Sequence, residues 1–345
     1  MSGKINVVTG GKGHVGYALV KELADRGEKI KLLLRSDSPV FDKIECEKIM
    51  GDVCDLQSLE KAFEGADTVY HVAGVVDISG TKDKQVWEVN VEGTKKVVEA
   101  CKKTGVKTLI YVSSIDAIPM GEGTQELTEI SHFDPDLLEG TYAKSKAAAT
   151  QYVLDNADDD LRVCVIHPST CIGPYDNNGT SSMASVIKLF SKGMFPITFD
   201  FGTCNFIDVR DCAKVMVAAA EKGRNGECYL ACGSVITLDD FIGVLADVCG
   251  RSHPRMVIKK EFVDKVIPVY DKISEVAKLP PMINEYSIRK ISENFNFVNT
   301  KARNELGFEP RPLKQSLVDM IEWEKKRKKK RDEAAKKAEN KKKTQ

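Results

Sequence analysis

The stretch TGGKGHVG, residues 9–16, decides the fold. It follows the apolar run INVV at residues 5–8 and leads into an amphipathic segment that ends near residue 26. Gly10 permits a tight turn, Gly13 lets the backbone approach a pyrophosphate, and Gly16 lets the following helix pack closely on the strand. The first turn of that helix offers unpaired N–H groups and the positive end of its dipole to phosphates. The stretch therefore predicts a strand, a phosphate-binding loop and a helix.

Outward from this loop, short apolar runs alternate with amphipathic segments through the first half of the chain. Strands that are apolar along their whole length and separated by helices indicate a parallel sheet covered on both faces. We expect the α/β class and the doubly wound Rossmann arrangement, in which ligands bind at the carboxyl ends of the strands. The predicted strands are 5–9, 29–34, 47–50, 67–73, 108–114 and 162–168, and the predicted helices are 14–26, 56–64, 83–104 and 141–156.

After Pro168 the alternation becomes less regular, which predicts a second, smaller lobe of mixed structure. A strand followed by a helix is expected over 206–222. A helix is expected over 236–250, with Thr237 as its N-cap and Gly250 after its end. The predicted organisation is a nucleotide-binding domain over 1–168 with 206–230 returning to it, a substrate lobe over 169–205 and 231–323, and a basic tail over 324–345.

The formal net charge is zero because two unequal parts of the chain cancel. Residues 324–345 carry 12 Lys and Arg against 4 Asp and Glu, whereas residues 1–323 carry 39 against 47. An acidic body argues against nucleic acid as the main ligand, since phosphate neutralisation requires a basic surface. We interpret the tail as a solvated extension of the last helix, with contact to an acidic membrane or to RNA as the alternatives.

Cysteine and histidine placement bears on compartment and on metals. The ten cysteines contain no Cys-x-x-Cys pair, and several lie in apolar runs, as Cys164 does in RVCVI. We interpret them as small buried side chains in a reducing compartment. The five histidines show no metal-ligand spacing, so no metal site is predicted. No signal peptide is visible and no apolar stretch approaches the ~18 residues of a membrane span, so we expect a cytoplasmic protein.

The end of the second predicted strand bears on which dinucleotide binds. An acidic residue about 20 residues beyond the glycines accepts a hydrogen bond from the ribose 2′-OH of NAD, and an arginine there accommodates the 2′-phosphate of NADP. Here the strand ends Leu34-Arg35-Ser36. A guanidinium pairs well with phosphate, and Ser36 adds a hydrogen bond, so NADP(H) is favoured. Asp37 follows closely enough to keep NAD(H) open.

Eight ordered motifs make the chain similar to a known family. They are TGGKGHVG (9–16), GDVCD (51–55), HVAG (71–74), NVEGT (90–94), YVSS (111–114), YAKSK (142–146), HPSTCIGP (167–174) and NFIDVRD (205–211). Each is weak alone, but in this order they resemble the extended branch of the short-chain dehydrogenase/reductase superfamily, which includes NAD-dependent epimerases and dehydratases. The resemblance covers residues 4–323. It is greatest to the dihydroflavonol-reductase-like and 3β-hydroxysteroid-dehydrogenase-like enzymes.

The resemblance implies a cofactor-binding role for each matching position. Asp52 would accept a hydrogen bond from the adenine amino group, Asn90 would lie near the nicotinamide, and Cys171 would lie near its carboxamide. His71 is expected to pack at its strand end rather than to act chemically. The whole predicted cofactor-binding set is Thr9, Gly10, Gly13, His14, Val15, Gly16, Arg35, Ser36, Asp52, Val53, Ala73, Gly74, Asn90, Tyr142, Lys146, Pro168 and Cys171.

Tyr142 and Lys146 are four residues apart, so on a helix they share one face. A free tyrosine has a pKa near 10 and is a poor acid or base at neutral pH, but a nearby cation lowers that pKa. The resemblance implies that Ser114 polarises the substrate oxygen and that Tyr142 exchanges the proton. It also implies that Lys146 lowers the tyrosine pKa and binds the nicotinamide ribose. Ser113 competes with Ser114 for the polarising role.

Two departures from the branch narrow the chemistry. Its sugar-nucleotide dehydratases carry an Asp-Glu pair where this chain has Ile115-Asp116, and its epimerases usually carry an acid where this chain has Arg35. Both departures favour a reductase with a dissociable cofactor. We therefore predict an enzyme, an NADP(H)-dependent oxidoreductase that interconverts a ketone or aldehyde and an alcohol. The alternatives are an NAD(P)-dependent nucleotide-sugar epimerase and a non-catalytic dinucleotide-sensing protein.

The predicted partner is a small, hydrophobic substrate. The segment 175–205 mixes large apolar side chains with small polar ones, which suits an apolar pocket, although the same side chains equally suit a core. These apolar side chains are Met183, Met194, Phe195, Phe199 and Phe201. Arg210 either binds an anionic group of the substrate or pairs with Asp208 or Asp211. The resemblance also implies a homodimer through the helices at 83–104 and 141–156.

Overall fold

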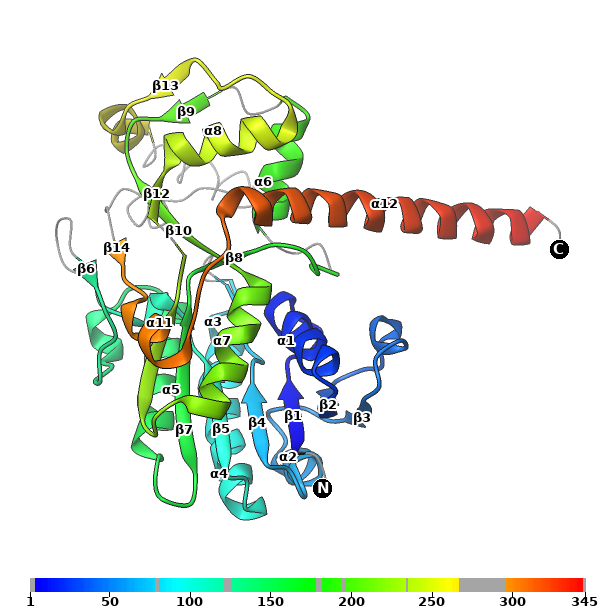
Figure 1. Ribbon diagram of the computed structural model, residues 1–345, viewed down its shortest axis with the longest axis vertical. Helices are drawn as coiled ribbons and strands as arrows, with labels where there is room; N and C mark the ends of the chain where they lie inside the picture. Colours follow the sequence, from blue (N-terminus) through cyan, green and yellow to red (C-terminus); the bar gives the residue numbers. More distant parts are fainter. Residues whose placement is uncertain are drawn as a thin grey trace.

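The computed structural model describes residues 4–77, 81–120, 126–177, 182–193, 197–233, 235–266 and 296–343. Its centre is one parallel sheet of seven strands: β1 (Ile5–Thr9), β2 (Lys29–Leu34), β3 (Glu47–Met50), β4 (Thr68–His71), β5 (Thr108–Val112), β7 (Arg162–Pro168) and β11 (Glu227–Ala231). The strand order is β11-β7-β5-β4-β1-β2-β3 (Figure 1). The order reverses between β1 and β4, so the predicted doubly wound Rossmann fold is confirmed.

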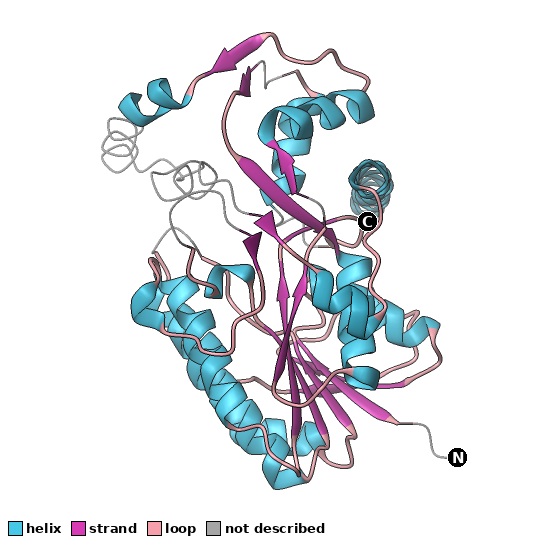
Figure 2. Ribbon diagram, turned by 60° about the vertical axis from the view of Figure 1, so that its left-hand side comes forward, coloured by secondary structure: helices cyan, strands magenta, loops and turns pink. Residues whose placement is uncertain are grey.

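Helices cover both faces of this sheet (Figure 2). One face carries α1 (His14–Asp25), α7 (Val209–Lys222) and α11 (Thr300–Leu306), and the other carries α2 (Leu56–Phe63), α4 (Gly93–Thr104) and α5 (Thr141–Asp155). Successive residues of a strand point to opposite faces, so Val7 packs under the second set of helices and Val8 under the first. Both are fully buried, which is why the strands lack an alternating polar pattern.

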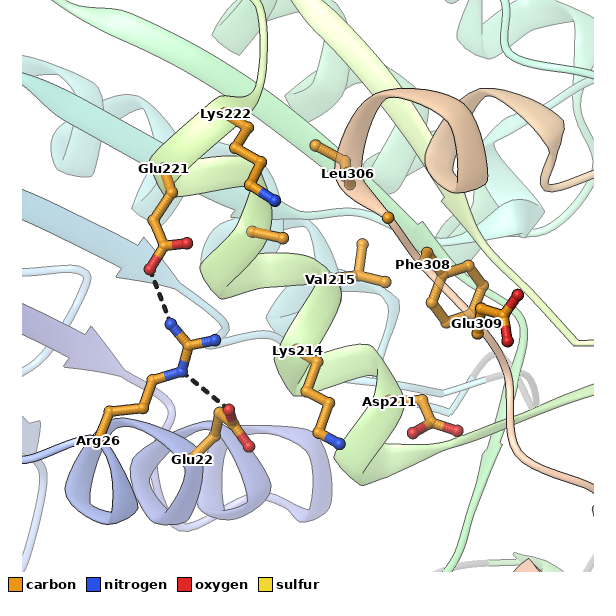
Figure 3. Close-up of a pocket in the computed structure, with 12 residues that line it drawn as sticks. Glu22, Arg26, Asp211, Lys214, Val215, Glu221, Lys222, Leu306, Phe308 and Glu309 are labelled. Carbon is orange, nitrogen blue, oxygen red and sulfur yellow. Dashed lines mark hydrogen bonds and ion pairs between the residues drawn. The ribbon is translucent and has the colours of Figure 1, made fainter.

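Helices α1 and α7 pack side by side on the first face (Figure 3). Leu23 of α1 and Val215 of α7 belong to the same buried cluster. At the solvent edge the Arg26 guanidinium donates to Glu22 (2.9 Å) and Glu221 (2.7 Å), which joins the two helices. A cavity of about 450 Å³ lies beside this bridge, and its walls carry charges of both signs. None of the predicted site residues lines it.

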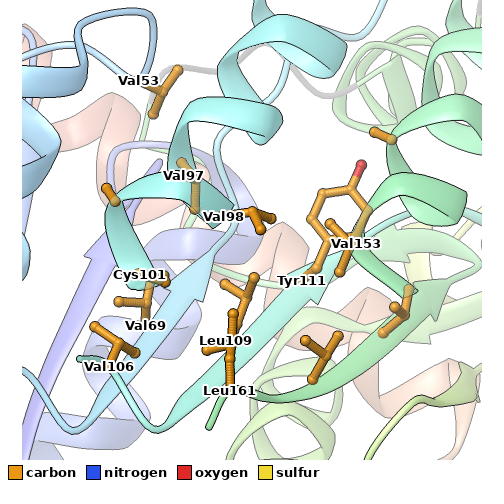
Figure 4. Close-up of a cluster of buried hydrophobic side chains, with 14 of the residues drawn as sticks. Val53, Val69, Val97, Val98, Cys101, Val106, Leu109, Tyr111, Val153 and Leu161 are labelled. Carbon is orange, nitrogen blue, oxygen red and sulfur yellow. The ribbon is translucent and has the colours of Figure 1, made fainter. Parts of the chain in front are cut away.

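The second face covers a cluster of β-branched and aliphatic side chains (Figure 4). Val97 and Cys101 of α4 and Val153 of α5 meet Val69 and Leu109 of the sheet, and all five are fully buried. Complete burial of such a valine or leucine stabilises the fold by about 1.5–3 kcal/mol. This packing holds the second set of helices against the strands whose carboxyl ends form the site.

The predicted helix over 83–104 is interrupted. It consists of α3 (Asp83–Trp87), a π-helical turn over Glu88–Glu92, and α4. A π turn adds one residue to a helical turn and is common at functional sites. The turn contains Asn90, which is buried. Apolar periodicity could not reveal it because the apolar spacing continues through the turn.

The smaller lobe has mixed sheets. Strands β8 (Thr170–Ile172), β10 (Thr203–Asp208) and β12 (Val235–Thr237) form one sheet, with β10 parallel to β8 and antiparallel to β12. The lobe also holds a parallel pair of β9 (Ile197–Phe199) with β13 (Met256–Ile258). A second parallel pair, β6 (Glu126–Leu127) with β14 (Asn296–Phe297), packs instead on the core of the central sheet. Short 3₁₀ helices lie at Pro39–Phe41, Ile115–Ala117 and Pro135–Leu137.

Three helices complete this lobe: α6 (Ser182–Ser191), α8 (Leu238–Cys249) and the start of α12 (Leu313–Lys343). They bury Phe206, Phe241 and Leu317 in a core of their own. The predicted cap of α8 is confirmed, because Thr237 Oγ1 accepts a hydrogen bond from the Asp240 amide (3.0 Å). Helix α12 then leaves the body and projects into solvent (Figure 1).

Two whole-chain features bear on the environment of the protein. The ten cysteines are all free thiols, and five of them are buried. In the part of the chain that the structure describes, no helix is both long enough and apolar enough to cross a bilayer.

Candidate active site

The glycine loop connects β1 to α1 in a conformation that only glycine allows at two positions. Gly10 has φ +74°, and a β-carbon built on it would lie 2.5 Å from the Ala73 nitrogen. A β-carbon on Gly16 would lie 2.2 Å from the Gly10 carbonyl oxygen. Gly13 is the N-cap of α1, and its amide donates to that same oxygen (2.9 Å). The loop therefore presents bare backbone and a helix N-terminus, the arrangement that binds a pyrophosphate.

A buried chain of hydrogen bonds stands behind this loop. The Thr9 hydroxyl contacts His71 Nδ1 (2.8 Å) and accepts from the Ala73 amide (3.3 Å). His71 Nε2 contacts the Thr94 hydroxyl (3.0 Å), which itself donates to the Asn90 carbonyl oxygen (2.6 Å). Since Thr94 uses its proton there, Nε2 is the donor and Nδ1 accepts from Thr9. Burial, with the Lys146 charge added, lowers the pKa of His71 to about 3, so the ring is neutral and holds the loop in place.

The carboxyl end of β2 carries cations and a hydroxyl. Arg35 and Ser36 are exposed, and Lys12 of the glycine loop donates to Ser36 Oγ (3.0 Å). Asp37 turns away from this group, because its carboxylate accepts from Lys48 (2.9 Å). That ion pair holds the pKa of Asp37 below its usual value. The contact of Lys12 with Ser36 was not predicted, since it joins two loops that are 24 residues apart.

One cavity of about 480 Å³ is lined by eight of the seventeen predicted cofactor residues. Asp52 lies in its wall, and one of its carboxylate oxygens accepts from the Cys54 amide (2.9 Å). The predicted residues that line this cavity are Gly10, Gly13, Arg35, Ser36, Asp52, Val53, Ala73 and Gly74. The cavity runs from the glycine loop along the ends of β2, β3 and β4, which is the path of a dinucleotide on this fold.

Asn90 orders the loop that follows β4. Its Oδ1 accepts from the Val75 amide (2.8 Å), and its Nδ2 donates to the Val75 carbonyl oxygen (3.0 Å) and to Ser145 Oγ (3.1 Å). A β-carbon on Gly74 would lie 3.3 Å from Oδ1 of this side chain. Asn90 therefore shapes the floor of the cavity through the backbone, and its own polar atoms are occupied by protein groups.

The two serines at the end of β5 differ in what their hydroxyls touch. Ser113 Oγ is buried against the Thr150 hydroxyl (2.7 Å) on α5, which ties the strand to the helix. Ser114 Oγ accepts from the Asp116 amide (3.2 Å) and caps the short 3₁₀ helix Ile115–Ala117. Ser113 Oγ is thus engaged by a neighbouring helix, whereas Ser114 Oγ is engaged by the short turn that directly follows it.

His167 is a site neighbour that sequence reasoning missed. Its Nδ1 donates to the Ser114 carbonyl oxygen (2.9 Å), and its ring stacks on Phe133 at 5.2 Å. Burial lowers the pKa of His167 to about 4, so the ring is neutral. It fixes the backbone that carries Ser114. In the sequence it was marked only by its place at the end of a predicted strand and at the start of the motif HPSTCIGP (167–174).

Helix α5 begins at Thr141 and places Tyr142 and Lys146 one turn apart. Tyr142 is half-buried, whereas Lys146 is 5% exposed. Lys146 Nζ donates to the Val112 carbonyl oxygen (2.8 Å) and lies over the Tyr111 ring, 5.1 Å from its centre. A β-carbon on Gly74 would be 3.4 Å from this nitrogen. Burial lowers the pKa of Lys146 to about 8.

The remaining predicted residues lie in α1, at the end of β7 and in β8. His14 Nε2 contacts the Pro174 carbonyl oxygen (2.8 Å), which joins α1 to the segment after β8. Val15 is partly buried against the core of the first face. Pro168 ends β7, and the Cys171 thiol contacts the Ser169 carbonyl oxygen (3.4 Å).

Arg210 forms ion pairs within the protein. Its guanidinium makes two bonds to Asp208 (2.9 and 2.7 Å) and one to Asp319 of α12 (2.6 Å). The sequence left two roles open for Arg210, binding of an anionic substrate group or an ion pair with Asp208 or Asp211. The structure shows the ion pair with Asp208. Of the apolar substrate candidates, Phe199 packs on the lobe core, and its ring lies edge-on to Phe201 at 5.6 Å. Met194 and Phe195 lie outside the described residues.

Comparisons with known proteins agree on the family to which this chain is similar. The sequence model of the 3-beta hydroxysteroid dehydrogenase/isomerase family matches residues 7–227. Sterol demethylase protein B of Methylococcus capsulatus is 30% identical over 329 residues, which cover 93% of this chain and 98% of that protein. A 3-beta-hydroxysteroid dehydrogenase of Mycolicibacterium neoaurum is 25% identical over 324 residues, covering 88% and 86%. The solved structure of gox2253 is similar with a TM-score of 0.81 and 27% identity, covering 94% and 98%.

Proposed function

Because this chain belongs to the 3-beta hydroxysteroid dehydrogenase/isomerase family, we propose that it is an NADP(H)-dependent oxidoreductase acting on a hydrophobic ketone, aldehyde or alcohol. It is an oxidoreductase of the extended short-chain dehydrogenase type. One observation carries the proposal. The cavity along the ends of β2, β3 and β4 is lined by Gly74, and a β-carbon on Gly74 would lie 3.4 Å from the nitrogen of the buried Lys146.

The choice of NADP(H) rests on the end of β2. Arg35 and Ser36 line the cavity, and Lys12 reaches the Ser36 hydroxyl. A 2′-phosphate here would meet two cations and a hydroxyl, which suits a dianion. Asp37, the acid that would favour a ribose hydroxyl, is paired with Lys48.

The measurement is fluorescence titration of NADPH and NADH with the wild type and Arg35→Ala. We expect NADPH binding to weaken about tenfold, since a charge-assisted hydrogen bond contributes roughly 1.5–3 kcal/mol and exposure reduces this. NADH binding should not change and is the internal control. Equal NADPH affinity in the two proteins would reject NADP preference at this position.

We propose the following division of labour at the nicotinamide end. The bound dinucleotide supplies or accepts the hydride. Tyr142 exchanges a proton with the substrate oxygen, and the Ser114 hydroxyl donates a hydrogen bond to it. Lys146, held by the Val112 carbonyl oxygen, is mostly protonated at pH 7 because its pKa is about 8. Its charge favours the phenolate form of Tyr142 and binds the ribose.

The test is a panel of apolar ketones and aldehydes with NADPH, followed by absorbance of the reduced nicotinamide. Tyr142→Phe should lower turnover by roughly 10²–10⁴-fold, the usual contribution of a positioned acid or base. It should leave NADPH affinity unchanged, because the phenol ring remains as a benzene ring of the same shape. Undiminished turnover in this variant, or no turnover on any carbonyl by the wild type, contradicts the proposed reaction.

The functional organisation follows from the same proposal. Residues 1–168 with 206–230 bind the cofactor, residues 169–205 and 231–323 bind the substrate, and the helices at 83–104 and 141–156 join two copies of the chain. Sedimentation velocity distinguishes this dimer from a monomer, and Trp87, which is 39% exposed on α3, gives a site for a disruptive charge.

A further inference from the structure

The apolar surface of the chain is concentrated in one place. Eight large hydrophobic side chains are exposed in the described part of the chain, and four of them lie within residues 256–266. Met256 is 59% exposed, Val257 51%, Phe262 58% and Val266 42%. The other four lie far apart in the sequence: Met50, Val76, Trp87 and Leu137. We call the exposed side chains of residues 255–266 the lobe-tip patch.

The lobe-tip patch occupies an extremity of the molecule. Figure 1 shows β13 at the end of the smaller lobe that lies farthest from the seven-stranded sheet. Among the described strands, β13 pairs with β9 alone. Residues 260–266 are helical, and Phe262 and Val266 are four residues apart, so they share one helix face. Val263 is buried and holds this short helix on the lobe.

Cations surround these apolar side chains. Arg255, Lys259 and Lys265 are exposed. Lys260 is paired with Asp264 (2.8 Å), so one of the two acids in this segment is already neutralised. The segment is therefore locally basic, although residues 1–323 as a whole are acidic.

We infer that the lobe-tip patch docks this protein on the surface of an anionic phospholipid bilayer. Aromatic and aliphatic side chains enter the boundary between headgroups and acyl chains, while lysine and arginine stay at the lipid phosphates. An acidic body would be repelled by such a surface, so the attraction must come from local basic groups. The basic tail on α12, with its 12 Lys and Arg, adds attraction at longer range.

A bilayer fits the lobe-tip patch better than a polynucleotide does. A polynucleotide would attract the cations, and a base could stack on Phe262, but Met256, Val257 and Val266 would stay in water. An anionic bilayer accommodates the cations at its phosphates and the apolar side chains among its acyl chains. The surface is also separate from the cofactor cavity, since none of residues 255–266 lines it.

The experiment is co-sedimentation of the full chain with vesicles of phosphatidylcholine, with and without phosphatidylglycerol. The wild type should bind vesicles that contain phosphatidylglycerol and should not bind vesicles of phosphatidylcholine alone. Phe262→Ser should weaken binding about tenfold through lost apolar burial. Lys259→Glu with Lys265→Glu should weaken it by at least that much, at about fivefold for each basic charge near the surface.

Matched controls separate this surface from general effects. Leu137→Ser removes a side chain that is 66% exposed elsewhere, and it should bind as the wild type does. Tyr142→Phe should also bind normally, so failure of the proposed reaction and failure of this inference are distinguishable. A Phe262→Trp variant reports directly, because its added emission should shift to shorter wavelength on mixed vesicles and be quenched by brominated acyl chains.

Four outcomes overturn the inference, and the first three concern the vesicles alone. The wild type does not sediment with mixed vesicles, or Phe262→Ser and Leu137→Ser weaken binding equally, or the tryptophan at position 262 stays in water on binding. Vesicle binding that a homopolymeric RNA displaces, with RNA affinity unaffected by Phe262→Ser, assigns the basic groups to a polynucleotide and also overturns it.

Discussion

Lys146 is expected to make the apo protein less stable below pH 8 while it serves the proposed reaction. Its ammonium is 5% exposed, and burial lowers its pKa from 10.5 to about 8. Replacing it by methionine keeps an unbranched side chain of similar length and removes the charge. The perturbation is therefore Lys146→Met, compared with the wild type across alkaline pH.

The sign and size of the effect follow from proton linkage. Between pH 8 and 10.5 the unfolded chain binds a proton at this lysine that the folded chain does not, so the unfolding free energy rises with pH. At about 1.4 kcal/mol per pH unit, the lowered pKa corresponds to about 3 kcal/mol. This penalty is fully present below pH 8 and is gone above 10.5. Lys146→Met has no such group, so the wild type should gain about 3 kcal/mol relative to it between pH 8 and 10.5, of which roughly 2.5 kcal/mol is expressed by pH 10.

The assay is urea unfolding of both apo proteins, followed by circular dichroism, at intervals from neutral pH to about pH 10. Lys144→Met is the matched control, because Lys144 lies on the same helix and is only half-buried. The variant should also lose turnover, since the charge beside Tyr142 is gone. A stability difference between wild type and Lys146→Met that stays flat with pH, or that falls as pH rises, would refute the reasoning.

Two paired substitutions test the loop and the strand end. Gly10→Ala meets both a positive φ and a β-carbon 2.5 Å from the Ala73 nitrogen, so we expect a loss above about 2 kcal/mol and lost cofactor binding. Gly105→Ala has the same φ of +74° with open space around it, so urea unfolding should show only about 1–2 kcal/mol. Ser113→Ala should cost about 1 kcal/mol through its lost buried hydrogen bond and keep turnover. Ser114→Ala should lower turnover and leave the unfolding free energy nearly unchanged. A turnover loss found only in Ser113→Ala would exchange the roles proposed for the two serines.

Much of the fold was predictable because its determinants are local. The strands at 5–9, 29–34, 47–50 and 162–168 begin and end where the apolar runs predicted. Two other predicted strands were too long by up to three residues, since β4 ends at His71 and β5 ends at Val112. In both cases the residues beyond the strand end are still apolar or small, so composition alone could not place the end.

The candidate site was less predictable because it depends on groups that meet across the fold. No local pattern indicates that Lys12 contacts Ser36, that Lys48 draws Asp37 away, or that His167 supports Ser114. These contacts join residues between 11 and 53 positions apart.

The sequence by itself determined the sheet, the glycine loop and the placement of Tyr142 and Lys146 one turn apart on a helix, because each depends on spacing within one or two neighbouring elements. Only the tertiary structure decided that the Ser113 hydroxyl is engaged in the core, because Thr150, which contacts it, lies on another element. It also decided that Lys146 is buried and has a lowered pKa, since desolvation comes from the surrounding strands and loops. Spacing along the chain specifies which groups are available, and packing specifies which of them remain exposed, charged or engaged.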